Sequence, residues 1–326
     1  MKQIILSILY LSLILPATAQ TFSAEYSALV RKADSLYESK DFKGSGYAYT
    51  QAFNANKGKG ASTDRYNAAF AWALAGMSDS TFFQLNRIVN VANYYNYAQI
   101  THDHDLNNLH TDNRWQPLLD LIKQNKERVE ANLNKPLVAL LDSIYNDDQS
   151  LRKELDIIEK KFGLGSIEVK ECWSVISKND SINLIKVEAF LHKYGWLGSD
   201  VIGVKGNSTL FLVIQHSNQT AQEKYLPMMR EAVKNGKANG SSLGLLEDRV
   251  ALNRSTKKVY GSQVAKDKET GLYYVRPLED PDNVDNRRAA IGLQPLADYV
   301  RRWQINWNVE LYKKDLVWII EKERGK

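Results

Sequence analysis

Cysteine is almost absent from this chain: its 326 residues include one, Cys172. A single cysteine excludes an intrachain disulfide, so the fold depends on side-chain packing rather than on covalent cross-links. Cys172 lies beside Trp173 in an apolar stretch, which is the usual setting of a thiol that packs as a small buried hydrophobic group. A reactive thiol at this position is the alternative.

Long apolar runs are also scarce. Beyond the first twenty residues, the apolar stretches at 210–214 and 316–320 are far shorter than the roughly 20 residues that a membrane-spanning helix needs. We therefore expect no membrane insertion of the chain after its first segment.

The chain lacks concentrated positive charge as well. It has 43 Lys and Arg against 38 Asp and Glu, a net charge of +5, and its basic residues occur in dispersed pairs. Nucleic-acid binding normally needs a clustered basic surface, so no nucleic-acid partner is expected. The sequence contains neither a P-loop nor an H-E-x-x-H motif, and we expect no cofactor.

The first residues have the pattern of a secretory signal peptide. Lys2 provides a positive start, residues 4–15 form a short apolar run, and residues 17–19 are small. We expect residues 1–19 to be removed after export, which makes the mature protein periplasmic or secreted. An uncleaved membrane anchor is the alternative.

Residues 20–134 are predicted to form a helical region, because apolar residues recur there at helical spacing. Two helical pairs have matching positions. Ala33 corresponds to Ala69 and Lys40 to Gly76, each at an offset of 36 residues. A period of this length is typical of helical repeats.

Two stretches carry a family resemblance in this region. Residues 66–76 read YNAAFAWALAG, and residues 103–115 fit the pattern D-x-D-L-x-x-L-x-x-D-x-R-[FW]. Both resemble bacterial tetratricopeptide arrays, although Ser45 and Lys57 depart from the usual alanine and proline. The resemblance implies a short helical array with a protein or peptide partner bound through residues 22–132.

A run of metal-ligand residue types falls inside the second of these stretches or next to it. The run comprises His102, Asp103, His104, Asp105, His110 and Asp112. The resemblance already accounts for the acidic residues, and a metal needs three or four ligands in a defined geometry. We expect no metal site.

Residues 135–303 are predicted to form a second, mostly helical α+β domain with one β-hairpin, followed by a C-terminal element at 304–326. The expected fold class of the whole chain is mainly α. The predicted helices are 137–161, two that begin at Asp180 and Ser208, 221–233, 243–252, 284–291 and 296–303. The hairpin is predicted from residues 259–264 and 272–278.

Several separated stretches of this domain resemble a bacterial family known as a domain of unknown function (family 6624). They are Gln215-His216 and residues 246–250, 260–263, 277–281, 284–288 and 292–293. Ser262 stands where the family usually has threonine. The resemblance implies no activity.

Polar residues in and near these stretches could meet at one centre. The candidate catalytic residues are His216, Asp248, Arg249, Gln263 and Glu279, and the candidate binding residues are Tyr260, Asp280, Asp285, Arg287 and Arg288. A histidine, carboxylates and an arginine would suit acid–base chemistry on an anionic or carbonyl-bearing substrate. The alternative is structural: buried ion pairs, with Asp285 capping the helix that follows it.

Three functions remain open from the sequence. The first is an exported scaffold that binds a protein, a peptide or an envelope ligand. The second is a periplasmic hydrolase or transferase with an acid–base site around His216. The third is a structural spacer.

Overall fold

The computed structural model of the chain describes residues 23–324 except residues 164 and 268. About 74% of it is helical, and its one sheet is a two-stranded antiparallel hairpin, so the expectation of a mainly α fold is confirmed. The predicted signal peptide lies outside the described residues. The helices in the described part of the chain are each too short or too polar to span a bilayer.

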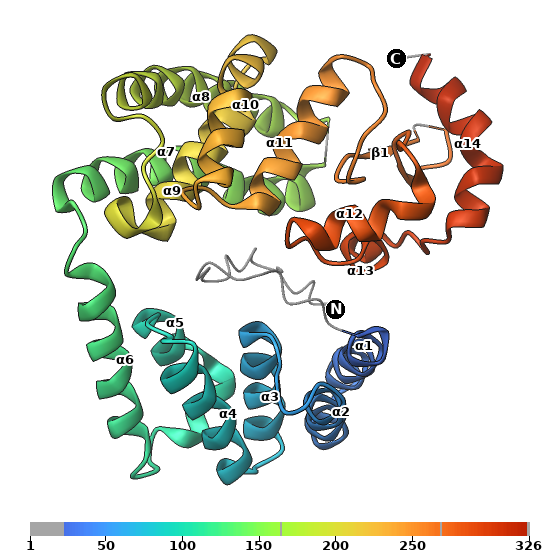
Figure 1. Ribbon diagram of the computed structural model, residues 1–326. Helices are drawn as coiled ribbons and strands as arrows, with labels where there is room; N and C mark the ends of the chain where they lie inside the picture. Colours follow the sequence, from blue (N-terminus) through green and yellow to red (C-terminus); the bar gives the residue numbers. More distant parts are fainter. Residues whose placement is uncertain (1–22, 164, 268, 325–326) are drawn as a thin grey trace. The chain divides into compact units, whose positions relative to one another are not determined.

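The chain divides into two compact units, the first ending at Asn132 and the second starting at Leu133 (Figure 1). The first unit contains α1 Ala24–Glu38, α2 Phe42–Ala55, α3 Ser62–Leu74, α4 Ser78–Val91, α5 Tyr97–His102, the 3-10 helix η1 His104–Leu109 and α6 Trp115–Glu130.

The first four helices form two hairpins of the same design. Lys40 and Gly76, 36 residues apart, both have the left-handed backbone that ends the first helix of each pair, with φ of 66° and 73°. Ser45 and Thr81, at the same offset, are both fully buried in the second helix of each pair. The first unit is therefore consistent with helical repeats.

Gly46 allows α2 to pack closely against α3. A Cβ atom at this position would lie 2.5 Å from the ring of Trp72. We expect Gly46→Ala to lower the free energy of unfolding by about 1–3 kcal/mol, because a well-packed core accommodates added volume poorly. Urea unfolding measures the change. Gly165→Ala is the control, because no atom lies within 4 Å of a Cβ there. Equal stability of Gly46→Ala and the wild type would contradict the prediction.

The segment 103–115 closes the array through specific contacts. Asp105 accepts a hydrogen bond from the hydroxyl of Tyr37 at 2.6 Å, and the Asn108 amide donates to the carbonyl of Ala73 at 2.6 Å. Arg114 binds the carboxylates of Asp112 and Asp79 at 2.7 Å each. The histidines of this region, His102, His104 and His110, are exposed. These acidic residues therefore have structural partners within the array.

A partly buried carboxylate makes the stability of the first unit depend on pH. Asp64 accepts a hydrogen bond from the Tyr26 hydroxyl at 2.6 Å. Burial and the nearby charge of Asp34 raise the pKa of Asp64 to about 6, although the Tyr26 hydrogen bond acts in the opposite direction. Between about pH 4 and pH 6, the folded protein therefore holds a proton on Asp64 that the unfolded chain, with a carboxyl pKa of about 3.9, has released.

We expect the stabilising contribution of protonated Asp64 to be complete below about pH 4 and to be lost as the pH rises through about 6. Asp64→Asn should remove this loss between those pH values. Urea unfolding at several pH values tests it, with Glu38→Gln on the exposed surface of α1 as the control. The same pH dependence in Asp64→Asn and wild type would refute the assignment.

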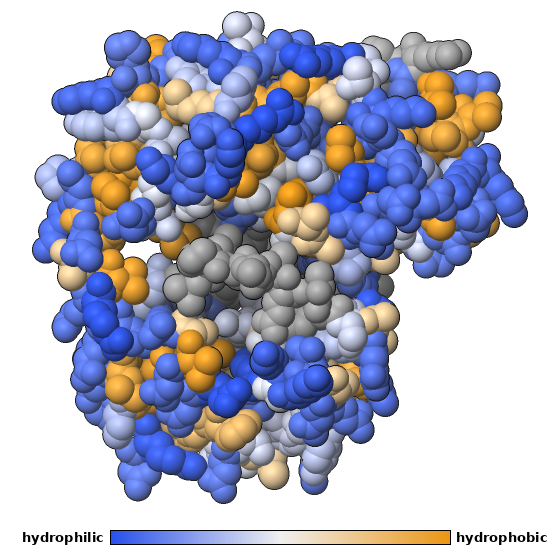
Figure 2. All heavy atoms as spheres, in the orientation of Figure 1, coloured by the Kyte–Doolittle hydropathy of each residue, from blue (hydrophilic) through white to orange (hydrophobic). Residues whose placement is uncertain are grey.

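The second unit begins with five helices, continues with the hairpin and several short helices, and ends with the longer helix α14. Its elements are α7 Lys135–Phe162, α8 Ile167–Tyr194, α9 Ser199–His216, α10 Gln219–Lys234, α11 Gly240–Asn253, β1 Val264–Lys266, β2 Tyr273–Val275, η2 Pro281–Asn283, α12 Val284–Ala290, α13 Leu296–Val300, η3 Arg301–Trp303 and α14 Val309–Arg324. In Figure 2, apolar and polar side chains are interspersed over the face that is shown.

Two of the predicted helix starts are wrong. Asp180 and Ser208 lie inside α8 and α9, which begin after Ser166 and Gly198. The Ser208 hydroxyl donates to the Val204 carbonyl of its own helix at 2.9 Å, which lets serine occupy a helix interior. Asp180 does not cap a helix and instead forms an ion pair with Arg152 of α7.

The hairpin is shorter than expected. Val264 pairs with Val275 and Lys266 with Tyr273, so residues 259–263 precede the first strand. Tyr260 and Gln263 therefore lie in a loop rather than on a strand, and the reason is a set of side-chain contacts described below.

The C-terminal helix α14 packs against the hairpin. Tyr312 and Ile319 are buried in a cluster with Tyr274, Val275 and Leu278. The Tyr312 hydroxyl accepts a hydrogen bond from the Leu278 amide at 2.7 Å. Residues 309–324 are thus part of the second unit's core.

Candidate functional site

A buried carboxylate lies on the apolar face of α7. Leu141, Ile144 and Asp148 follow one another at helical spacing, and Asp148 is only 1% exposed. An ionised carboxylate inside a protein needs partners that replace its lost hydration. The partners of Asp148 therefore define this site.

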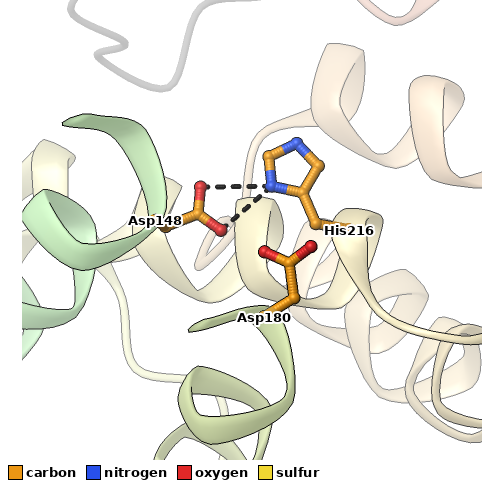
Figure 3. A group of neighbouring side chains, drawn as sticks. All are labelled: Asp148, Asp180 and His216. Atoms are coloured by element: carbon orange, nitrogen blue, oxygen red, sulfur yellow. Dashed lines mark hydrogen bonds and ion pairs between the residues drawn. The ribbon is translucent and has the colours of Figure 1, made fainter. Parts of the chain in front are cut away.

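His216, the last residue of α9, is the main partner of Asp148 (Figure 3). Its Nδ1 lies 3.0 and 3.1 Å from the two carboxylate oxygens of Asp148. The side chain of His216 is 21% exposed, so its ring lies at the edge of the helical core. Among the described residues, no hydrogen bond to its Nε2 is formed.

The protonation of Asp148 determines which ring nitrogen of His216 carries a proton. Burial acts to raise the pKa of Asp148, but the hydrogen bonds of His216 and Gln149 and the charges of His216 and Arg152 lower it overall. An ionised carboxylate can only accept hydrogen bonds. Nδ1 of His216 therefore donates to Asp148, and in the neutral ring Nε2 has a free lone pair.

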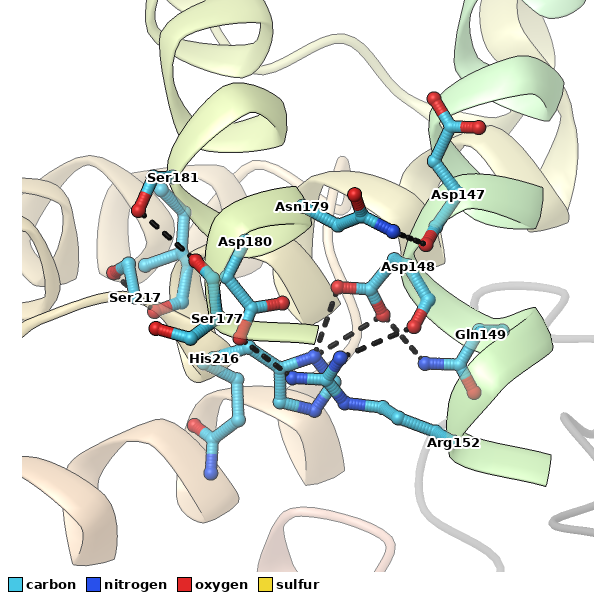
Figure 4. A network of polar contacts seen from close by, with 12 residues as sticks. Asp147, Asp148, Gln149, Arg152, Ser177, Asn179, Asp180, Ser181, His216 and Ser217 are labelled. Atoms are coloured by element: carbon cyan, nitrogen blue, oxygen red, sulfur yellow. Dashed lines mark hydrogen bonds and ion pairs between the residues drawn. The ribbon is translucent and has the colours of Figure 1, made fainter. Parts of the chain in front are cut away.

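Asp180 joins this pair from α8 and is held by an arginine (Figure 4). Nη2 of Arg152 lies 2.8 Å from Oδ2 of Asp180, and Nη1 donates to the backbone carbonyl of Asp148 at 3.1 Å. The second oxygen of Asp180 is buried and has no hydrogen-bond partner in the part of the chain that is described.

Asn183 adds further unsatisfied polar atoms on the same helix. It lies three residues after Asp180, so both side chains are on one face of α8. Asn183 is 1% exposed, and neither atom of its amide has a partner among the described residues. Buried polar atoms without partners are uncommon in native structures, and a catalytic role is one recognised reason for them.

Asp148, Asp180 and His216 are the only described residues grouped closely enough to share a metal ion, with ligand atoms within 4.8 Å of one another. Both carboxylates already have partners within the protein. Arg152 provides a positive charge to Asp180, and the Nδ1 proton of His216 occupies the position facing Asp148. The contacts fit an acid–base arrangement.

Residues 135–311, just over half of the chain, match the model of a protein family described as Family of unknown function (DUF6624). The chain belongs to this family. No curated protein matches it, and no solved structure does. Asp148, Asp180 and His216 all lie within the DUF6624 domain.

The other predicted catalytic residues of the DUF6624 domain are not bonded to His216. Among the described residues, no hydrogen bond or ion pair connects His216 with Asp248, Arg249, Gln263 or Glu279. No contact among the described residues therefore supports a single catalytic centre made of His216 and these four residues.

Asp248 instead organises the loop before the hairpin. Its carboxylate is fully buried and accepts hydrogen bonds from the backbone amides of Val259, Tyr260 and Ser262 at 2.7, 3.0 and 2.7 Å. These amides are consequently not available for pairing in a strand. This explains why β1 starts only at Val264 and why Tyr260 and Gln263 lie outside it.

Two arginines hold the carbonyl side of the same loop. Arg288 is fully buried and donates to the carbonyl of Tyr260 at 2.6 Å, and Arg287 donates to that of Val259 at 2.9 Å. Arg287 also donates to the carbonyls of Glu279 and Asp280. Both arginines therefore bind mainly backbone carbonyls.

The remaining candidates have local contacts. Asp285 accepts from the Leu296 amide at 2.6 Å and does not cap its own helix, so the cap prediction is wrong. Asp280 pairs with Arg287 at 3.5 Å. Other contacts are those of Gln263 with the Ser262 hydroxyl at 3.2 Å and of Tyr260 with Glu247 at 3.1 Å.

Glu279 has an exposed side chain, whereas Arg249 is partly buried. The Nε of Arg249 is buried without a partner among the described residues, and burial lowers the pKa of this arginine. Of the predicted catalytic residues other than His216, Arg249 is thus the one with unsatisfied hydrogen-bonding capacity.

Residues 240–244 read GSSLG and match the string G-x-S-x-G with Ser242 at its centre. In α/β-hydrolases this string forms a strained turn between a strand and a helix, which exposes the serine. Here the string opens α11 and follows α10, and Asn239 caps the helix by accepting from the amides of Ser241 and Ser242. The surroundings of Ser242 are not those of a nucleophile elbow.

The sequence did not indicate Asp148, Arg152 or Asp180 as site residues; Asp180 was predicted only as the start of a helix. One signal was present for Asp148, because a charged residue in the apolar stripe of residues 137–161 must be buried with a partner. Its partner His216 is 68 residues away along the chain, and that pairing could not be read from local pattern.

Proposed function

We propose that the DUF6624 domain is a hydrolase or transferase in which His216 is the general acid–base residue. The observation that carries the proposal is the bond between Nδ1 of His216 and the buried carboxylate of Asp148 at 3.0 Å. A carboxylate in this position fixes the ring orientation and tautomer and stabilises the imidazolium that forms during proton transfer.

The free Nε2 would accept a proton from water or from a substrate hydroxyl, and would return it to the leaving group. Asp180 and Asn183 would contribute to substrate placement. Asp180 has an unsatisfied oxygen, and its ligand atoms lie within 4.8 Å of those of the pair. The unsatisfied amide of Asn183, on the same face of α8, offers a further acceptor and a donor. Arg152 holds Asp180 in place through the 2.8 Å ion pair.

Genetic complementation tests this proposal without a known substrate. In a strain that lacks the gene and shows a phenotype, we expect His216→Ala to fail to restore it. His192→Ala, in an exposed histidine of α8, should restore it fully. Thermal unfolding of both purified variants separates loss of activity from loss of folding. A folded His216→Ala protein that restores the phenotype would eliminate the proposed role.

A second proposal concerns the first unit, which we propose to be a tetratricopeptide-like scaffold that binds a protein or peptide. Two hairpins of the same design and the contacts of the closing segment 103–115 support it. Capture of partners from an envelope extract, with and without residues 22–132, tests the role. Identical sets of captured proteins would contradict it.

We also propose that the protein acts in the periplasm or outside the cell. The support is the pattern of residues 1–19. Mass spectrometry of the protein recovered from its native host should find Gln20 as the first residue. An intact N-terminus on protein recovered from the cytoplasm would contradict export.

A further inference from the structure

The first unit contains a groove with an uncompensated positive charge. It has a volume of about 400 Å³ and lies between the end of α2, the start of α3 and the middle of α4. Its lining includes Lys57, Lys59, Arg65 and Arg87, and no acidic residue. Among the described residues, none of these four cations forms an ion pair.

The two arginines share a single backbone acceptor. Arg65 donates to the Gly58 carbonyl at 2.5 Å, and Arg87 approaches the same oxygen at 3.4 Å. Arg65 also donates to Gln84 at 2.7 Å. Burial, followed by the charge of Arg87, lowers the pKa of Arg65. Like charges therefore lie close together here, and a bound anion would relieve their repulsion.

The groove also has an aromatic wall. The Arg65 guanidinium lies 4.3 Å from the ring centre of Phe53, which it covers. Phe83, on α4, is 60% exposed. An exposed phenylalanine beside unpaired cations fits a ligand that carries both carboxylates and an apolar side chain.

We propose that this groove binds an acidic segment of a protein partner, with carboxylates at Arg87 and Lys57 and an apolar side chain against Phe83. Arginine is suited to this contact because its planar guanidinium binds a carboxylate through two parallel hydrogen bonds. The four cations are confined to one groove, without the extended basic surface that a nucleic acid needs. The proposal rests on the scaffold role proposed for residues 22–132.

Fluorescence anisotropy with the full mature chain tests it. The probe is a labelled eight-residue peptide of alternating Glu and Leu, and the control peptide alternates Gln and Leu. We expect binding of the Glu peptide only, weakening as salt is raised from about 0.05 to about 0.5 M because of screening. The double variant Lys57→Glu with Arg87→Glu should bind at least about tenfold more weakly.

Two further variants keep the result interpretable. Lys32→Glu with Lys43→Glu reverses two exposed charges of the same unit outside the groove, and should change the affinity by less than about threefold. Phe83→Ala should weaken binding of the Glu and Leu peptide, and should not change the affinity for a peptide of alternating Glu and Ser.

Three results would overturn the proposal: no binding of the Glu and Leu peptide by the wild type, equal binding of the Gln and Leu peptide, or equal losses in the groove and control variants. Equal affinity for Glu–Leu and Glu–Ser peptides, with full displacement by inorganic phosphate, would identify a small-anion site instead. If captured partners depend on residues 22–132 but not on Lys57 and Arg87, the scaffold role stands and the groove assignment fails.

Discussion

Replacing Asp248 with alanine is expected to lower the free energy of unfolding by about 3–5 kcal/mol, because several backbone amides lose their charged acceptor at once. The substitution removes the acceptor of three backbone amides, those of Val259, Tyr260 and Ser262. Asp248 is fully buried, so water cannot take its place without a structural change. Urea unfolding followed by circular dichroism measures the difference.

Asp142→Ala is the matched control for this measurement. Asp142 forms a surface ion pair with Lys205 at 3.0 Å, and its loss should change stability by less than about 0.5 kcal/mol. An Asp248→Ala protein with near wild-type stability but no activity would show that Asp248 acts in catalysis rather than in folding.

The second large effect concerns Asp148. We expect Asp148→Asn to reduce turnover by up to about 10⁴-fold, the loss caused by the equivalent change in serine proteases. The asparagine amide can donate to Nδ1 of His216, which places the ring proton on Nε2 and removes the proposed base. The loss should appear mainly in kcat rather than in KM, because Asp148 is only 1% exposed and acts through His216 rather than on the substrate.

Complementation gives the first measurement of this effect, and kinetic assay follows once a substrate is known. The control is Asp147→Asn, which changes the neighbouring exposed carboxylate that pairs with Lys186 at 3.0 Å. Full activity in Asp148→Asn and wild type alike would remove Asp148 from the mechanism.

The sequence pattern predicted the helical hairpins of the first unit well. It was less reliable for the starts of helices and the ends of strands in the second unit. The offset of 36 residues followed from steric demands that recur in each repeat, such as the left-handed turn at Lys40 and Gly76. The strand ends depended on Asp248, whose hydrogen bonds draw residues 259–262 away from the sheet. A preference for strand at those residues was overridden by a side chain from α11.

The candidate site was only partly predictable for the same reason. His216 could be selected because an imidazole at the end of an apolar run needs a partner. The sequence offered several carboxylates as partners, among them Asp248 and Glu279 in the family stretches. In the structure, Asp248 binds the loop before the hairpin and Glu279 is exposed. Asp148 meets His216 only because α7 and α9 pack together, a contact between positions 68 residues apart.

The most direct test of the proposed acid–base pair is the tautomer of His216, measured by ¹⁵N nuclear magnetic resonance of the histidine side chains, with His216→Ala used for assignment. Spectra are recorded at rising pH until the ring is neutral. The proposal predicts a proton on Nδ1 and none on Nε2 in the wild type, and the reverse in Asp148→Asn. A neutral wild-type ring with its proton on Nε2 would contradict the role of Asp148 and leave His216 without the free base on which the proposed function depends.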